Sequence, residues 1–223
     1  MACKLVPINL KNPSEFAELQ RQRTACGWGN TPADLALWRE KQEAGLKSFF
    51  WITKPTTNNI PPSLSPSQSS SSLQSIDSID SATDTIIRAG HISLDAYTHP
   101  ADPELANEDK TNLTIQQFFI LPEHRAGGLG RAAMSQIEAL APTEPYGSSN
   151  CEYVTLNTMS KEHFYDPVLG PYVRMVQPIC NQEWYEKQGY VLWKVEGRYH
   201  DTLPDGKEVV FDAAFMRKKV VRE

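Results

Sequence analysis

The chain has 223 residues, of which 40% are hydrophobic, and a formal net charge of −5 at pH 7. This length and composition can supply one sizeable hydrophobic core, so we expect a single domain over residues 1–223. The negative charge argues against nucleic acid or anionic membrane as a partner, and no apolar run approaches transmembrane length.

The cysteines and the N-terminus indicate the compartment. Cys3, Cys26, Cys151 and Cys180 are scattered without a Cys-x-x-Cys pair, which predicts free thiols rather than a metal site or a disulfide framework. Residues 1–7 lack the apolar segment of a signal peptide. We therefore expect an intracellular, cytoplasmic protein without a metal, and leave a nuclear location open.

Two N-terminal helices are predicted from their capping residues. Asn12-Pro13-Ser14-Glu15 supplies a cap, a proline suited to the first helical position and a glutamate that completes a capping box. Thr31-Pro32-Ala33-Asp34 repeats this pattern, and Gly45 is typical of a helix C-terminus. Further helices are predicted at residues 129–140 and 181–188, the second ended by Gly189, whereas residues 159–178 are expected to be irregular.

Seven runs have the β-branched, aromatic or alternating character of strands. They are residues 5–10, 48–53, 86–94, 113–121, 153–157, 190–199 and 208–217. The last two flank Pro204-Asp205-Gly206, so we expect them to form a hairpin.

The segment at about 55–84 differs in composition from the rest of the chain. It contains Pro61-Pro62 and four consecutive serines from Ser69, and few residues that could form a core. This predicts a Ser/Pro-rich disordered insertion between two adjacent strands. A surface loop without a role is the simpler interpretation, and a phosphorylated segment is the alternative.

A glycine-rich loop, Arg125-Ala126-Gly127-Gly128-Leu129-Gly130, lies between a predicted strand and a predicted helix. Successive backbone N–H groups beside a helix N-terminus form an anion site, most often for phosphate. A Walker loop is excluded because no Lys-Ser or Lys-Thr follows the glycines. A dinucleotide fingerprint matches formally from Gly128 to Ala133, but residues 122–127 separate its glycines from the strand, and Glu152 begins the next strand instead of ending it.

Two motifs in this order resemble those of the GNAT acetyltransferase superfamily. Residues 125–130 match its Arg/Gln-x-x-Gly-x-Gly/Ala signature, and Pro122-Glu123-His124 is similar to its Pro-Glu-Tyr lead-in. Trp184-Tyr185-Glu186-Lys187-Gln188-Gly189-Tyr190 is similar to its second motif, Tyr-Glu-Lys-x-Gly-Phe. The resemblance covers nearly the whole chain apart from the insertion. It implies an α/β (α+β) GNAT fold, a mixed twisted sheet of about six to seven strands flanked by about four helices.

The resemblance also implies acetyl-coenzyme A as the co-substrate, with its diphosphate on the glycine loop and its pantetheine arm along the preceding strand. A backbone N–H near the end of that strand would polarise the thioester carbonyl. The residues expected to bind it are Phe119, Ile120, Leu121, Arg125, Ala126, Gly127, Gly128, Leu129, Gly130, Arg131 and Asn181. Asn181 is included, with Asn157 as the alternative, because Pro178 stands where the family often has an asparagine.

The implied reaction is direct attack of an amine on the thioester. Tyr185 matches the family tyrosine that protonates the leaving thiolate. The base is open: the strand before the loop carries Gln116 and Gln117 but no acid, so His91, Glu123 and His124 are weak candidates. Deprotonation through water is the favoured route.

The acceptor is expected to be a small-molecule amine or a peptide amine, and the protein a monomer or a homodimer. Trp28, Tyr172 and Tyr199 are weak candidates for the acceptor pocket, because aromatic rings attract cations. Glu196, Asp201 or Asp205 would favour a cation too. Two other functions remain open: a non-catalytic acyl-coenzyme A sensor or scaffold with the same fold, and a nicotinamide-dependent oxidoreductase.

Overall fold

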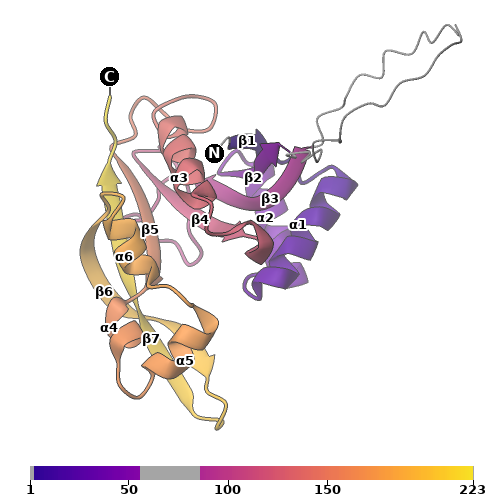
Figure 1. Cartoon of the computed structure of the whole chain (residues 1–223). Helices are drawn as coiled ribbons and strands as arrows, with labels where there is room; N and C mark the ends of the chain where they lie inside the picture. The colour runs from indigo at the N-terminus through magenta and orange to yellow at the C-terminus, as the bar shows by residue number, and fades with distance from the viewer. Residues whose placement is uncertain (1–2, 56–85, 223) are drawn as a thin grey trace, which may run out of the picture.

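The computed structural model describes residues 3–55 and 86–222 (Figure 1). Within these ranges, seven strands form one sheet in the order β1-β2-β3-β4-β5-β7-β6. The strands are β1 (Lys4–Pro7), β2 (Lys47–Pro55), β3 (Ile86–Asp95), β4 (Asn112–Ile120), β5 (Tyr153–Met159), β6 (Val191–Thr202) and β7 (Glu208–Lys219). Among these described strands, only β4 and β5 pair in parallel. This confirms the predicted mixed sheet, whereas the predicted disordered insertion lies outside the described residues apart from Pro55.

Six α-helices are found among the described residues. They are α1 (Pro13–Cys26), α2 (Pro32–Glu43), α3 (Leu129–Leu140), α4 (Lys161–Tyr165), α5 (Gly170–Val176) and α6 (Asn181–Glu186), with one 3-10 turn, η1 (Pro122–His124). None of the described helices is both long enough and apolar enough to cross a membrane.

The structure corrects one element prediction. Residues 159–178 are not irregular, because α4 and α5 lie within them. Ser160 caps α4 by accepting from the Glu162 N–H, and the carboxylate of Asp166 accepts from two backbone N–H groups before α5. Such local caps can start a short helix even where the segment is rich in proline and aromatic residues.

The two predicted capping boxes have different outcomes. At α2 the box is confirmed: Thr31 Oγ1 accepts from the Asp34 N–H at 3.1 Å, and Asp34 accepts from the Thr31 N–H at 3.2 Å. At α1 it is wrong. Asn12 does cap the helix, but the Glu15 carboxylate accepts from the Asn9 N–H at 2.8 Å instead of completing the box.

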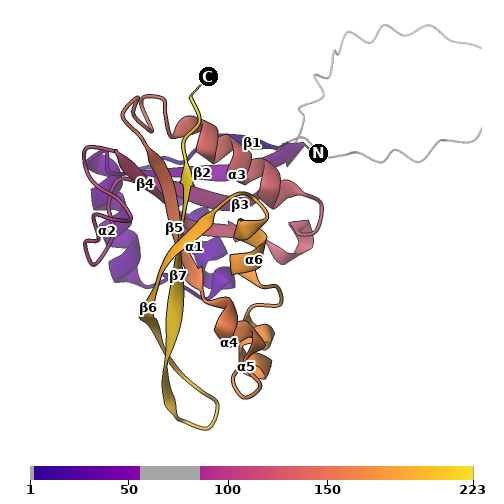
Figure 2. The ribbon, with the colours of Figure 1, turned by 90° about the vertical axis from the view of Figure 1, so that its left-hand side faces the viewer.

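The helices cover both faces of the sheet (Figures 1 and 2). The alternation along β2 shows why both faces are buried. Phe49 and Trp51 pack in one core cluster with α1 and α2, and Phe50 and Ile52 pack in another with α3. Because β2 is covered on both sides, it is a continuous apolar run.

The sheet opens at its centre, between β4 and β5. Their register pairs only Asn112–Thr114 with Tyr153–Thr155. Beyond Thr114, β4 remains paired with β3 as far as Ile120, and β5 remains paired with β7 as far as Met159. The two strands therefore diverge and leave the free edge of each facing the other.

Candidate functional site

The opening between β4 and β5 is lined by side chains from β4, α3 and α6. The Phe118 ring on β4 lies 5.9 Å from the Trp184 ring on α6. A Cβ on Gly130, in the first turn of α3, would lie 3.3 Å from Trp184 and 3.5 Å from Phe118. The absence of a side chain at Gly130 therefore lets Phe118 and Trp184 approach the first turn of α3 closely.

Backbone groups of β4 point into the opening in a pattern that the sequence did not indicate. The Leu121 N–H donates to the Ala89 carbonyl of β3 at 2.9 Å. Backbone N–H groups alternate along a strand, so that of Phe119 also points towards β3, and those of Phe118 and Ile120 point into the opening. The donor was predicted within the range from Phe119 to Leu121, and the N–H of Ile120 in this range faces the opening, whereas that of Leu121 is already paired. The prediction did not include Phe118.

The glycine loop presents a row of free donors at the top of this opening. Ala126 and Gly128 have φ angles of +66° and +77°, which turn the chain sharply before α3. In the stretch from Ala126 to Arg131, no backbone N–H has a hydrogen-bond partner among the described residues. Arg125 folds back, donating from Nε to the Ile120 carbonyl at 2.9 Å. The loop can therefore bind an anion such as a diphosphate through backbone groups alone.

Tyr185 of α6 and Tyr199 of β6 both carry a phenol whose pKa is raised. Burial raises the pKa of Tyr185, and the nearby Tyr199 raises it further. Burial raises the pKa of Tyr199 to about 12, against a smaller opposing effect of Arg198. Both groups therefore keep their protons at neutral pH, as a proton donor must.

The three candidate bases lie in two different settings, and the structure argues against His91. His91 is fully buried, with Nδ1 at 2.9 Å from Gln22 Oε1 and Nε2 at 3.3 Å from Arg23 Nη1. Burial, followed by the charges of Arg23 and Lys47, lowers its pKa well below the usual value. His91 is thus a packed, neutral histidine beneath α1. Glu123 and His124 lie in η1, in the turn that follows β4.

The other predicted site residues are placed as follows. Trp28 is 47% exposed in the turn between α1 and α2. The Tyr172 hydroxyl donates to Asp201 at 2.8 Å, so it is already paired. Asn181 begins α6, one helical turn before Tyr185. In the described ranges, no three His, Cys, Asp or Glu side chains gather so that they could hold a metal ion.

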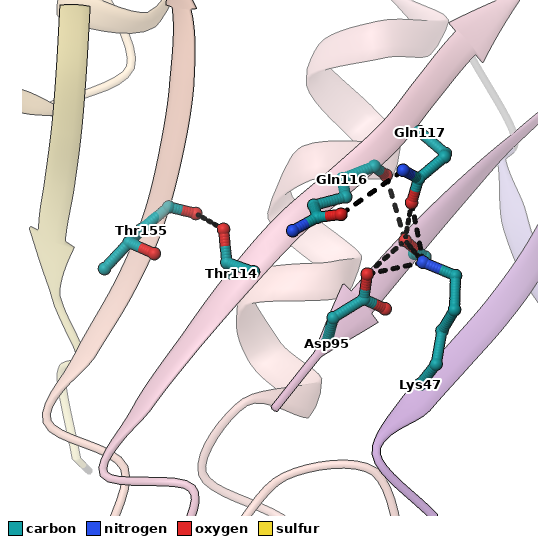
Figure 3. Close-up of polar contacts among 7 residues, drawn as sticks. Lys47, Asp95, Thr114, Gln116, Gln117 and Thr155 are labelled. Carbon is teal, nitrogen blue, oxygen red and sulfur yellow. Dashed lines mark hydrogen bonds and ion pairs between the residues drawn. The ribbon is translucent and has the colours of Figure 1, made fainter. Parts of the chain in front are cut away.

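A buried polar cluster beside β4 was not found from the sequence (Figure 3). Lys47 Nζ lies 2.5 Å from Asp95 Oδ2 and 2.6 Å from Gln117 Oε1. Burial lowers the pKa of Lys47 and raises that of Asp95 to about 6. The attraction between the two groups acts in the opposite direction on each pKa but is smaller than the effect of burial. At the base of the opening, Thr114 Oγ1 contacts the Thr155 carbonyl at 3.4 Å.

This geometry can be compared with known proteins. No protein-family model matches the sequence, and no curated protein matches it either. Solved structures do match in three dimensions. Arabidopsis thaliana NAA60 in complex with acetyl-CoA is 12% identical, with a TM-score of 0.53, and the match covers 98% of this chain and 99% of that one. The chain has the GNAT fold.

Two further structures with this fold give similar values. A spermidine N-acetyltransferase chimera of Vibrio cholerae SpeG and hSSAT is 12% identical, with a TM-score of 0.53, covering 97% of this chain and 94% of that one. An aminoglycoside 6'-N-acetyltransferase complexed with coenzyme A is 12% identical, with a TM-score of 0.53, covering 100% and 99%. At these identities the likeness establishes the GNAT fold and leaves the acceptor open.

The burial of His91 predicts a pH-dependent stability. The unfolded chain binds a proton at His91 below about pH 6.5, whereas the native state resists it, so the native state loses stability as the pH falls. Relative to His91→Gln, the wild-type free energy of unfolding should decrease by about 1.4 kcal/mol between pH 7.5 and 5.5. Urea unfolding at both pH values measures this. Other groups, Asp95 among them, titrate in both proteins, so their effects largely cancel when the two free energies of unfolding are subtracted.

The exposed His200, replaced by glutamine in the same way, is the matched control. If the difference in unfolding free energy between wild type and His91→Gln does not change with pH, the native state accepts the proton at His91. His91 would then return as a candidate base.

Proposed function

We propose that this protein is an N-acetyltransferase that moves an acetyl group from acetyl-coenzyme A to an amine by direct attack. The observation that carries the proposal is the continuity of free backbone donors along one path. The N–H groups of Phe118 and Ile120 face the opening between β4 and β5, and those from Ala126 to Arg131 follow where β4 ends. A molecule with an amide-rich arm and a diphosphate is complementary to this path.

The co-substrate would be held by these two sets of groups. Its diphosphate would lie on the N–H groups of the glycine loop, where the dipole of α3 favours negative charge. Its pantetheine arm would lie beside the free edge of β4 and pair with its backbone, as an added strand does. Gly130 lacks a side chain where the arm would pass Trp184 and Phe118.

The chemistry follows from the groups at the opening. An amine with a pKa near 10 is mostly protonated at neutral pH, and removing its proton costs about 4 kcal/mol over roughly three pH units. Because His91 is engaged and β4 carries no acid, water would carry this proton to solvent. The nitrogen attacks the carbonyl carbon, and a β4 N–H stabilises the oxyanion, typically by about 3–4 kcal/mol. The C–S bond then breaks as Tyr185 protonates the thiolate, and the proton that the attached nitrogen loses restores the phenol of Tyr185.

The acceptor class remains an amine, either of a small molecule or of a peptide. The named acceptors of the solved neighbours, spermidine and aminoglycosides, are amines of this kind and give a first panel. The alternative function, an acyl-coenzyme A sensor without catalysis, is favoured by the two glutamines of β4, Gln116 and Gln117, where a carboxylate would serve as a base.

Cofactor binding is tested by a pair of loop variants. Gly128→Ala places a Cβ at a φ of +77°, which strains the loop and narrows the approach to its N–H groups. We expect the affinity for coenzyme A, measured by calorimetry, to fall at least tenfold. Ala126→Gly is the control, because glycine adopts the φ of +66° already present there, and its affinity should stay within about threefold of wild type. Equal affinity in Gly128→Ala and wild type would remove the loop from the site.

Catalysis is tested by release of the thiol across a panel of amines. Tyr185→Phe should lower kcat at least tenfold and leave the KM for acetyl-coenzyme A nearly unchanged, because only the proton donor is removed. Tyr165→Phe is the matched control, since that tyrosine is exposed on α4 and contacts only Glu183 through its hydroxyl. An unchanged kcat in Tyr185→Phe would contradict the acid role. If wild type binds acetyl-coenzyme A tightly but releases no thiol with any amine, the non-catalytic sensor function would be favoured.

A further inference from the structure

Where β4 pairs with β3, β4 contains one extra residue, which forms a β-bulge. Ser93 of β3 pairs with Gln116, but His91, two residues away, pairs with Phe119, three residues away. Gln117 lies in this bulge with a φ of +44°, a left-handed conformation that residues other than glycine, asparagine and aspartate rarely adopt.

The bulge decides which N–H groups of β4 face the opening. Gln116 and Phe119 both pair with β3, so the backbone N–H of each points towards β3. In a regular strand, Phe118 would share the direction of Gln116 and also face β3. The extra residue reverses the alternation, so that Phe118 and Ile120 face the opening instead.

The buried polar cluster holds this bulge (Figure 3). Gln117 Oε1 accepts from Lys47 Nζ at 2.6 Å and lies 3.0 Å from Ser93 Oγ. Ser93 Oγ also lies 3.1 Å from the carbonyl oxygen of Gln116. Asp95 anchors the other side, at 2.5 Å from Lys47 and 3.1 Å from Ser93. The side chain of the bulge residue Gln117 is therefore tied to Lys47 and Ser93, and the backbone of the bulge is tied to Ser93.

Stability alone does not account for this cluster. The side chains of Lys47 and Asp95 are both 0% exposed. Two charges taken out of water are often replaced by apolar side chains of similar size without loss of stability. Gln116, Gln117 and Phe118 are only half-buried, so the cluster joins the core to the edge of the opening.

We propose that Lys47 and Asp95 are positioning residues that lock the left-handed Gln117 bulge and thereby aim the Phe118 N–H at the thioester carbonyl. The inference rests on the proposed function. It adds that the oxyanion donor depends on a buried ion pair from β2 and β3, strands that do not border the opening. Loss of the pair would let β4 relax towards regular alternation and turn this donor away.

The first test replaces the pair by apolar groups. Lys47→Met with Asp95→Leu should leave the melting temperature within a few degrees of wild type or raise it. We expect kcat to fall at least tenfold and the KM for acetyl-coenzyme A to change less than threefold. Adding Gln117→Gly to this double variant should raise its kcat at least threefold. Glycine adopts a positive φ without help from side-chain hydrogen bonds. The exposed pair Lys11 and Glu43, changed to glutamines, is the control.

A second pair of variants keeps the inference testable if the double variant does not fold. Gln117→Val forces a β-branched residue into a positive φ, whereas Gln117→Gly does not. We expect the valine variant to be at least tenfold slower than the glycine variant. Equal rates, or a folded double variant with kcat within twofold of wild type, would overturn the proposal.

A readout without turnover separates this inference from the proposed function. In protein with ¹⁵N-labelled phenylalanine, the Phe118 amide resonance of the free protein should move when Lys47 and Asp95 are replaced, and should return towards its wild-type position when Gln117→Gly is added. An unmoved resonance would overturn the positioning role, even in an active enzyme. Wild-type protein that bound no acetyl-coenzyme A would instead overturn the proposed function.

Discussion

The pairing of β4 with β5 ends at Thr114, and the rest of the site depends on this. Parallel strands normally share a continuous ladder of hydrogen bonds, and an open ladder leaves backbone groups that need another partner. Here the unpaired edge of β4 runs directly into a loop whose N–H groups also lack protein partners. An elongated ligand with an anionic end would satisfy both sets of groups at once, and this supports the acetyl-coenzyme A site proposed above.

The surroundings of the opening have one physical property in common, which is a low effective dielectric. Burial keeps Tyr185 and Tyr199 protonated and keeps His91 neutral. The same burial makes the contact between Lys47 and Asp95 sensitive to geometry, because charges out of water interact strongly and tolerate little displacement. In the proposed mechanism, this environment would hold the proton donor, the backbone donor and the buried ion pair, and water would remove the proton from the acceptor.

The sequence predicted those features that depend on local patterns. The glycine loop, α3, the second motif around Tyr185 and the central strands all follow from residues that are neighbours along the chain. Features that depend on pairing distant segments were missed. Lys47, Asp95 and Gln117 meet only because β2, β3 and β4 are adjacent in the sheet. The bulge at Gln117 has no glycine to mark it, so the predicted range for the donor, Phe119 to Leu121, included Ile120 but not Phe118.

A crystal structure of the protein with acetyl-coenzyme A tests the central claim most directly. The account predicts the diphosphate on the N–H groups from Ala126 to Arg131, the pantetheine arm between β4 and β5, and the thioester oxygen within hydrogen-bond distance of the Phe118 N–H. It also predicts Gln117 at a positive φ. Cofactor bound elsewhere on the molecule, or β4 and β5 closed into a continuous ladder with the cofactor present, would contradict it.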